Sequence, residues 1–264
     1  MMKYRTWRSI QKAQLFLLLV FFCVLAVLLV RSGKPPSRSI EDVHQTMTKA
    51  THDCESTPWM RAEESEMIAK YLLPNDVMFE YGSGHSSCVW SHFVKELISV
   101  EHDKKWHDKI KKSTRPNQRL VLVERELGYA EYRIRDKPSP LNAYVDYVDS
   151  VGFLPEGPFV DKVLIDGRAR PQCAYAALSQ LRDHNSLVFI HDWNSLLPDR
   201  TYYRTVLEWF DVIEEVAGSP GLVVLRPKQA RLRLPGPELF PEWWYTNVEN
   251  GVEVTSGYRG GESA

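Results

Sequence analysis

The stretch DVMFEYGSGHSSCVWSHFVKELISVEHD, residues 76–103, decides the fold that we expect for this chain. It opens with a short apolar run typical of a strand, and two glycines separated by Ser83 follow that run. A helical pattern then leads into a second apolar run at 97–100, which ends at Glu101. Strand, glycine turn, helix, strand and acid in this order predict the first half of a nucleotide-binding βαβ unit.

The residue types in this stretch have physical reasons to bind such a ligand. Gly82 and Gly84 permit positive φ and let the backbone approach a ligand closely. The start of the helix offers free N–H groups and the positive end of the helix dipole. Glu101 follows about twenty residues later, where an acidic side chain binds ribose hydroxyls. We therefore expect a nucleotide-like ligand at the ends of these two strands.

Apolar runs and helical patterns alternate along the rest of the chain. Further strands are expected at 118–123, 161–165, 186–190, 211–216 and 222–225. Helical patterns separate them, and the last two flank a turn as a hairpin. This order predicts an α/β fold: a Rossmann-like, mostly parallel seven-stranded sheet with helices on both faces and a C-terminal antiparallel hairpin. Ligands of such sheets bind at the carboxyl ends of the strands. The candidate functional residues are therefore strand-terminal: Glu80, Glu101, Asp166, His191 and Asp192.

Length and charge limit the classes of function. A chain of 264 residues holds one sizeable α/β domain. The formal net charge of −1 gives no support for a nucleic-acid partner. The apolar fraction of 44% is ordinary for a globular protein, which excludes wholesale disorder.

Residues 14–30 form an uncharged run of mostly Leu, Val and Phe with basic residues on both sides. Its length just spans a bilayer, and we interpret it as an N-terminal transmembrane helix that acts as a signal-anchor. A cleaved signal peptide and a buried helix are the alternatives. Basic residues are denser before the run, which predicts a cytoplasmic segment at 1–13 and a lumenal remainder. The expectation is a single-pass type II membrane protein of the Golgi or ER.

The remaining chain is divided by composition. The polar, proline-containing segment 31–56 is interpreted as a stem, residues 57–228 as the folded domain, and the proline-rich residues 229–264 as a tail. Cys54, Cys88 and Cys173 follow the predicted span. In an oxidising lumen these three allow at most one internal disulfide, and the sequence does not select the pair.

Three segments together resemble the class I S-adenosylmethionine-dependent methyltransferases. They are EYGSGHSS at 80–87, VEHD at 100–103 and IDGR at 165–168. The closing hairpin is also usual in that family, and the resemblance covers roughly residues 58–228. The strings DGRARPQCA at 166–174 and IHDW at 190–193 resemble a small branch of methyltransferase-like proteins. The resemblance implies a methyltransferase fold with S-adenosylmethionine as its cofactor.

The resemblance also implies roles for the matching positions. The glycine loop would contact the methionine part of the cofactor, Glu101 would bind both ribose hydroxyls, and Asp166 would lie at the transfer centre. Ser86 stands near the place where the family often carries a third glycine. The implied cofactor-binding set is Glu80, Tyr81, Gly82, Ser83, Gly84, Ser86, Glu101, His102, Asp103 and Asp166.

Methyl transfer is an in-line displacement that mainly requires alignment and exclusion of water. A hydroxyl acceptor also benefits from a general base, for which His191 is the first candidate and Asp166 the second. A divalent cation, Mg²⁺ or Ca²⁺, is a further candidate cofactor because oxygen donors cluster at two strand ends. These metal candidates are Asp166, Asp192 and Asn194. The candidates for acceptor binding are Arg168, Arg170 and Trp193.

Each candidate also has a structural interpretation. The two glycines can serve a tight turn alone, Glu101 can stabilise a helix N-terminus, Asp166 can cap the next helix, and His191 can be structural.

The expected function is O-methylation of a glycan or another secretory acceptor. A Golgi-type glycosyltransferase that uses a nucleotide sugar is an alternative, because residues 101–103 imitate an acid-x-acid metal motif. A non-catalytic scaffold with a methyltransferase fold is another.

Overall fold

The structure of the chain is a computed structural model, and it describes residues 35–124, 145–154, 159–194, 198–232, 246–249 and 252–255. The chain divides into two compact units, Met1–Pro36 and Ser37–Ala264, and the second holds the sheet. The predicted span at 14–30 lies outside the described residues. None of the helices described is both long and apolar enough to cross a bilayer.

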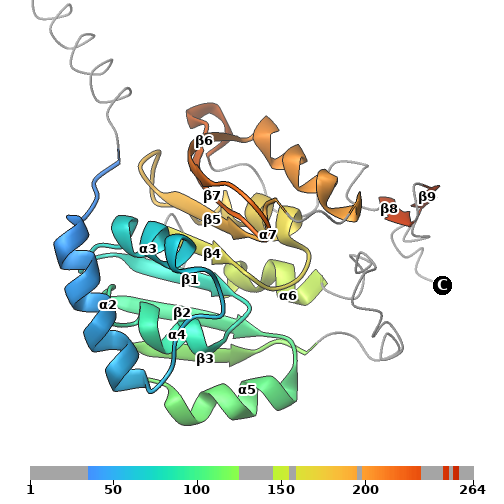
Figure 1. The fold of residues 1–264 in the computed structure, drawn as a ribbon. Helices are drawn as coiled ribbons and strands as arrows, with labels where there is room; N and C mark the ends of the chain where they lie inside the picture. Colours follow the sequence, from blue (N-terminus) through green and yellow to red (C-terminus); the bar gives the residue numbers. More distant parts are fainter. Residues whose placement is uncertain are drawn as a thin grey trace, which may run out of the picture. The chain divides into compact units, whose positions relative to one another are not determined.

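Seven strands form one mixed sheet in the order β3-β2-β1-β4-β5-β7-β6 (Figure 1). They are β1 (Val77–Tyr81), β2 (Glu96–Glu101), β3 (Gln118–Leu122), β4 (Lys162–Ile165), β5 (Leu187–His191), β6 (Phe210–Val216) and β7 (Leu222–Pro227). The first five run parallel, and β7 pairs antiparallel with both β5 and β6. The predicted mostly parallel sheet with a closing hairpin is confirmed. A separate hairpin joins β8 (Thr246–Glu249) to β9 (Val252–Thr255).

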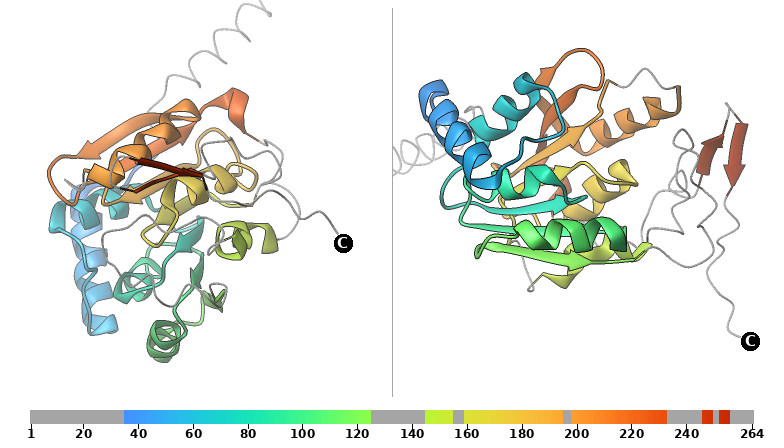
Figure 2. Two further views of the ribbon diagram at one scale, coloured as in Figure 1. Left: turned by 90° about the vertical axis from the view of Figure 1, so that its right-hand side faces the viewer. Right: turned by 60° about the horizontal axis from the view of Figure 1, so that its bottom comes forward.

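Helices cover both faces of the large sheet (Figure 2). One apolar core lies beneath α2 (Ile40–Cys54), α3 (Ala62–Tyr71) and α4 (His85–Trp90). The other lies beneath α6 (Val145–Asp149), α7 (Arg170–Ala177) and the 3₁₀ segment η4 (Pro198–Glu208). Helix α5 (Lys104–Ile110) lies against β2 and β3. Short 3₁₀ turns are η1 (Lys111–Ser113), η3 (Ser150–Phe153) and η5 (Gln229–Arg231). The order of the strands reverses between β1 and β4, so their carboxyl ends flank a crevice.

All five residues of β1 are buried, and their side chains alternate between the two cores. Phe79 and Tyr81 belong to the core beneath α6 and α7, and Met78 belongs to the core beneath α4. Glu80 has the same parity as Met78, so its carboxyl group is directed into the core beneath α4 rather than towards the crevice.

The prediction of a stem at 31–56 is wrong for most of its length, because residues 40–54 form helix α2. The hydroxyl of Ser39 caps this helix by accepting the Asp42 N–H at 3.2 Å. Four side chains at the spacing of one helix face pack on the core beside α3 and α4: Val43, Met47, Ala50 and Cys54. The polar residues that suggested a linker belong to the other face of this helix.

A disulfide joins Cys54 at the end of α2 to Cys88 in α4, with the two Cα atoms 6.0 Å apart. Cys173 is a buried free thiol in α7. The pairing that the sequence left open is therefore Cys54 with Cys88, and it fastens α2 to the helix that follows the glycine loop.

Replacing both Cys54 and Cys88 with serine should lower the free energy of unfolding by about 3–4 kcal/mol, because the bond closes a long loop of the unfolded chain. The measurement is urea unfolding of the full-length protein in detergent, with and without dithiothreitol. The wild type should lose its advantage over the variant in reductant. A gap that persists in reductant would show that packing of the sulfur atoms, and not the cross-link, stabilises the fold.

Candidate functional site

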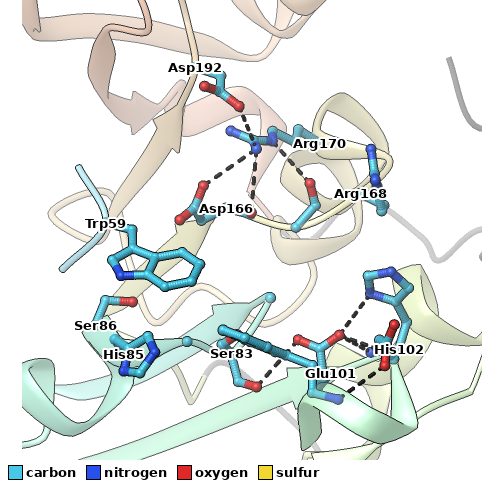
Figure 3. A pocket seen from close by; sticks show the side chains of 15 residues that line it. Trp59, Ser83, His85, Ser86, Glu101, His102, Asp166, Arg168, Arg170 and Asp192 are labelled. Carbon is cyan, nitrogen blue, oxygen red and sulfur yellow. Dashed lines mark hydrogen bonds and ion pairs between the residues drawn. The ribbon is translucent and has the colours of Figure 1, made fainter. Parts of the chain in front are cut away.

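A cavity of about 650 Å³ lies at the carboxyl ends of β1, β2, β4 and β5 (Figure 3). Its size is within the range of small-molecule sites. Loops after these four strands supply most of its walls. The lining residues are Trp59, Gly82, Ser83, Gly84, His85, Ser86, Glu101, His102, Asp103, Trp106, Asp166, Gly167, Arg168, Arg170 and Asp192. The cavity thus collects most of the predicted site residues.

The two glycines of the loop have different reasons to be glycine. Gly82 has φ +90°, and a Cβ there would lie 2.7 Å from both the Cα and the N atom of Gly167. It therefore lets the loops after β1 and β4 touch. A Cβ at Gly84 would meet only Ser86, at 3.5 Å. The protein's own packing does not require glycine at 84, and its absent side chain leaves room in the cavity.

Glu101 ends β2 with its carboxylate at the cavity, and the side chain is only 3% exposed. Its Oε1 accepts the N–H groups of His102 and Asp103, each at 2.8 Å. The Ser83 hydroxyl lies 3.3 Å from Oε2. The strand end therefore fixes the orientation of this carboxylate, and Oε2 has only this one long contact within the described part of the chain.

Glu80 and Tyr81 were predicted to bind the cofactor, but neither lines the cavity. Glu80 accepts the hydroxyls of Ser87 and Ser99, both at 2.6 Å, and of Ser86 at 3.4 Å. Tyr81 faces the other core, where its hydroxyl donates to a backbone carbonyl of α6 at 2.8 Å. The strand alternation that buries both side chains is the physical reason for this difference.

The buried Glu80 should give the protein a measurable dependence of stability on pH. Burial raises the pKa of Glu80 from 4.5 to about 7, although the bonds from Ser87 and Ser99 oppose this. The folded chain then holds a proton that the unfolded chain releases above its ordinary pKa. The stabilisation that Glu80 contributes is therefore complete below about pH 4.5 and is lost as the pH rises towards 7.

The free energy of unfolding of the wild type should fall as the pH is raised from 5 to 8. In Glu80→Gln this fall should be smaller by about 2 kcal/mol, because glutamine has no proton to release. Urea unfolding of both full-length proteins at the two pH values measures this difference. Parallel losses in the two proteins would mean that Glu80 does not titrate in this range.

Asp166 follows β4 and lines the cavity. Its Oδ1 lies 2.8 Å from Nδ1 of His191, whose Nε2 lies 3.3 Å from Glu64 of α3. Glu64 is fully buried and also accepts the N–H groups of Arg61 and Gly221, at 2.8 and 2.9 Å. An imidazolium at 191 donates to both carboxylates, so these residues connect the cavity wall to α3.

The prediction of His191 as a general base is not supported by this geometry. Burial lowers the pKa of His191, but the hydrogen bond and charge of Asp166 outweigh burial and leave the pKa raised. Both ring nitrogens face carboxylates, and the side chain does not line the cavity. A base needs a nitrogen that reaches the acceptor. His191 therefore orients Asp166, which remains the candidate base.

The predicted metal set is not supported either, because an arginine occupies its centre. Arg170 Nη2 lies 2.8 Å from Asp192 and 3.4 Å from Asp166 (Figure 3). Its guanidinium also donates to backbone carbonyls of residues 166, 167 and 191. Asn194 is engaged elsewhere, because its amide oxygen accepts from Arg204 at 2.8 Å. Two carboxylates neutralised by a buried guanidinium are poor ligands for a hard cation.

The three predicted acceptor-binding residues have different positions. Arg168 is exposed and lines the cavity. Arg170 lines it too, but its guanidinium joins the ends of β4 and β5. Trp193 is buried outside the cavity lining, and Arg204 stacks 4.2 Å from its ring centroid. The structure therefore does not place Trp193 at the cavity.

Sequence reasoning missed several residues of the site. Trp59, His85 and Trp106 form part of the cavity wall, and Glu64 lies behind Asp166. Trp59 could have been noticed as a large aromatic residue at the start of the predicted folded domain, but nothing local shows its contact with α4 and α5. Glu64 looks like an ordinary acid in the first turn of a helix.

No protein-family model matches the sequence, and no curated protein matches it. Among solved structures, the chain is similar to a methyltransferase-like protein from Silicibacter pomeroyi, with TM-score 0.48, 22% identity, and coverage of 66% of this chain and 89% of that chain. It is similar to an rRNA methylase from Streptococcus thermophilus, with TM-score 0.43 and 11% identity. That match covers 66% of this chain and 100% of the methylase. It is also similar to fibrillarin from Aeropyrum pernix with S-adenosyl-L-methionine bound, with TM-score 0.40 and 14% identity. That match covers 58% of this chain and 67% of the fibrillarin chain.

Proposed function

We propose that the protein is an S-adenosylmethionine-dependent methyltransferase that methylates a hydroxyl of a glycan or another secretory acceptor. The observation that carries this proposal is the pairing of an open glycine loop at Gly84 with the fixed carboxylate of Glu101. Both face one cavity at the reversal of strand order. The antiparallel β7 beside β5 agrees with the hairpin expected from the resemblance to class I methyltransferases.

The residues present fit this cofactor. Glu101 Oε2 is directed to accept hydroxyl groups such as a ribose diol, while its partner oxygen is held by the backbone. Gly84 leaves space for a chain to pass along the loop. The volume of about 650 Å³ accommodates a nucleoside together with an acceptor group.

When bound, S-adenosylmethionine would supply a methyl group from its sulfonium sulfur to the acceptor hydroxyl. Asp166 would take the proton of that hydroxyl. Within the described residues Asp166 Oδ2 has no hydrogen bond, while Oδ1 is held by His191. Asp166 can therefore receive the proton on a fixed carboxylate.

The glycosyltransferase alternative is weakened by the use of the acidic pair at 101 and 103. Glu101 accepts two backbone N–H groups, and Asp103 caps α5 by accepting the Trp106 N–H at 3.0 Å. Carboxylates committed to the backbone in this way are poorly arranged to share a metal ion. The scaffold alternative predicts no cofactor binding at all.

We further propose a type II membrane protein whose domain lies in the lumen of the Golgi or ER. The uncharged run at 14–30 and the disulfide between Cys54 and Cys88 support this, since disulfides persist in oxidising compartments. Protease treatment of intact microsomes tests it: the domain should be protected until detergent is added. Digestion without detergent would contradict it.

A thermal-shift panel on the full-length protein in detergent separates the functions. S-adenosylmethionine and S-adenosylhomocysteine should raise Tm, because a ligand that binds the folded state stabilises it by mass action. Nucleotide sugars with Mn²⁺ should not. A shift with the nucleotide sugars alone would favour the glycosyltransferase, and no shift with any ligand would favour the scaffold.

A further inference from the structure

One wall of the cavity is aromatic and reaches solvent. Trp59 is 70% exposed, although it is a large apolar side chain. Its ring centroid lies 4.9 Å from that of His85 and 5.4 Å from that of Trp106. The indole N–H of Trp106 donates to the carbonyl of Ser83 at 2.6 Å and so fixes this ring beside the glycine loop. We call Trp59, His85 and Trp106 the aromatic wall.

Two cations, Arg168 in the cavity lining and Lys109 against the rings of the aromatic wall, have no acidic partner within the described part of the chain. Lys109 Nζ lies 4.3 Å from the ring centroid of Trp106 and 5.8 Å from that of Trp59. Arg168 lies across the cavity from Trp59 (Figure 3). By contrast, Arg170 and His191 are both paired with carboxylates. Lys109 therefore carries an unpaired positive charge next to the aromatic wall, and Arg168 carries another on the opposite side of the cavity.

Lys109 lies 3.4 Å from Nε2 of His85. Burial, and then the charge of Lys109, lower the pKa of His85. His85 is therefore neutral at pH 7 and contributes a ring surface rather than a third charge.

We propose that the aromatic wall and Lys109 bind the acceptor, and that the acceptor is a ring that carries an acidic group. An apolar face of such a ring packs on indole, and its acid pairs with Lys109 from one side or Arg168 from the other. This inference rests on the proposed function, which assigns Gly84 and Glu101 of the same cavity to the cofactor. A hexuronic acid and an aromatic acid share this chemistry.

The test uses full-length protein in detergent, saturated with S-adenosylhomocysteine, and ligand-observed NMR titrations. The acidic probes are methyl glucuronide and para-hydroxybenzoate, and the neutral counterparts are methyl glucoside and para-hydroxybenzyl alcohol. At least one acidic probe should bind, several-fold more tightly than its counterpart. The pair that binds identifies the acceptor as a sugar or an aromatic acid.

Variants then assign the binding to the wall. Trp59→Ala should weaken the acidic probe about tenfold through loss of stacking. Lys109→Met should weaken it about threefold and reduce the preference over the neutral probe. Lys105→Met is the matched control, because Lys105 is an exposed lysine of the same helix and the ring contacts of the aromatic wall are made by Lys109 instead. Both Trp59→Ala and Lys109→Met should bind S-adenosylmethionine as the wild type does.

Three results would overturn the inference. One is cofactor binding with no binding of either acidic probe, and another is equal affinity for acidic and neutral probes. The third is a loss of S-adenosylmethionine affinity in Trp59→Ala and Lys109→Met, which would assign the wall to the cofactor's own carboxylate or adenine. If the wild type itself failed to bind S-adenosylmethionine in a separate titration, the proposed function would fail first, and this inference with it.

Discussion

Replacing Gly82 with alanine is expected to lower the free energy of unfolding by about 3 kcal/mol or more. The residue has φ +90°, where a Cβ is strained, and the added atom would lie 2.7 Å from two backbone atoms of Gly167. Backbone atoms cannot rotate away, so the loops after β1 and β4 would have to separate. Urea unfolding of the full-length protein in detergent measures the loss.

Gly84→Ala is the matched control for this experiment. It lies two residues away in the same loop, its backbone is extended, and a Cβ would make only an ordinary contact with Ser86. The cost should stay below about 1 kcal/mol, the usual penalty of alanine at a helix N-cap. Similar losses at 82 and 84 would contradict the assignment of Gly82 to the fold and of Gly84 to the ligand.

Replacing Glu101 with alanine should weaken the binding of S-adenosylmethionine by about 1–3 kcal/mol, the usual cost of leaving buried hydrogen-bond partners unpaired. The variant removes the proposed acceptor for the ribose hydroxyls and also the acceptor for the N–H groups of His102 and Asp103. Calorimetric titration of wild type and variant gives the difference in binding free energy.

Two further variants separate these contributions. Glu101→Gln keeps an amide oxygen for the two N–H groups but removes the negative charge, so it should bind the cofactor with intermediate affinity. Glu96→Ala, at the opposite end of β2 and outside the cavity lining, should bind it normally. Unchanged affinity in Glu101→Ala would mean that the ribose does not bind at this strand end.

Most of the sheet could be predicted because its signals are local. The glycine turn, the short apolar runs and the closing hairpin each determine their own element, and a parallel sheet follows from their alternation. The same local patterns placed Glu101, Gly84 and Asp166 at the cavity. Helix α2 was also visible as an apolar repeat at helical spacing, but its polar composition and the neighbouring prolines favoured a linker.

The errors arise where a side chain's direction or a distant partner matters. A position at a strand end suggests a side chain that faces the ligand, but the alternation of β1 directs Glu80 into the core. Glu64 is far from His191 in the sequence, so nothing local indicates that it occupies the second ring nitrogen. Arg170 likewise contacts acids at the ends of two strands, Asp166 after β4 and Asp192 after β5. Its guanidinium therefore lies where the sequence predicted a metal ion.

The most direct test of the central claim is a calorimetric titration of the full-length protein in detergent with S-adenosylmethionine. We expect saturable binding at one site per chain, with S-adenosylhomocysteine competing for the same site. Absence of any binding heat at millimolar S-adenosylmethionine, from a protein that unfolds cooperatively in the same buffer, would contradict it.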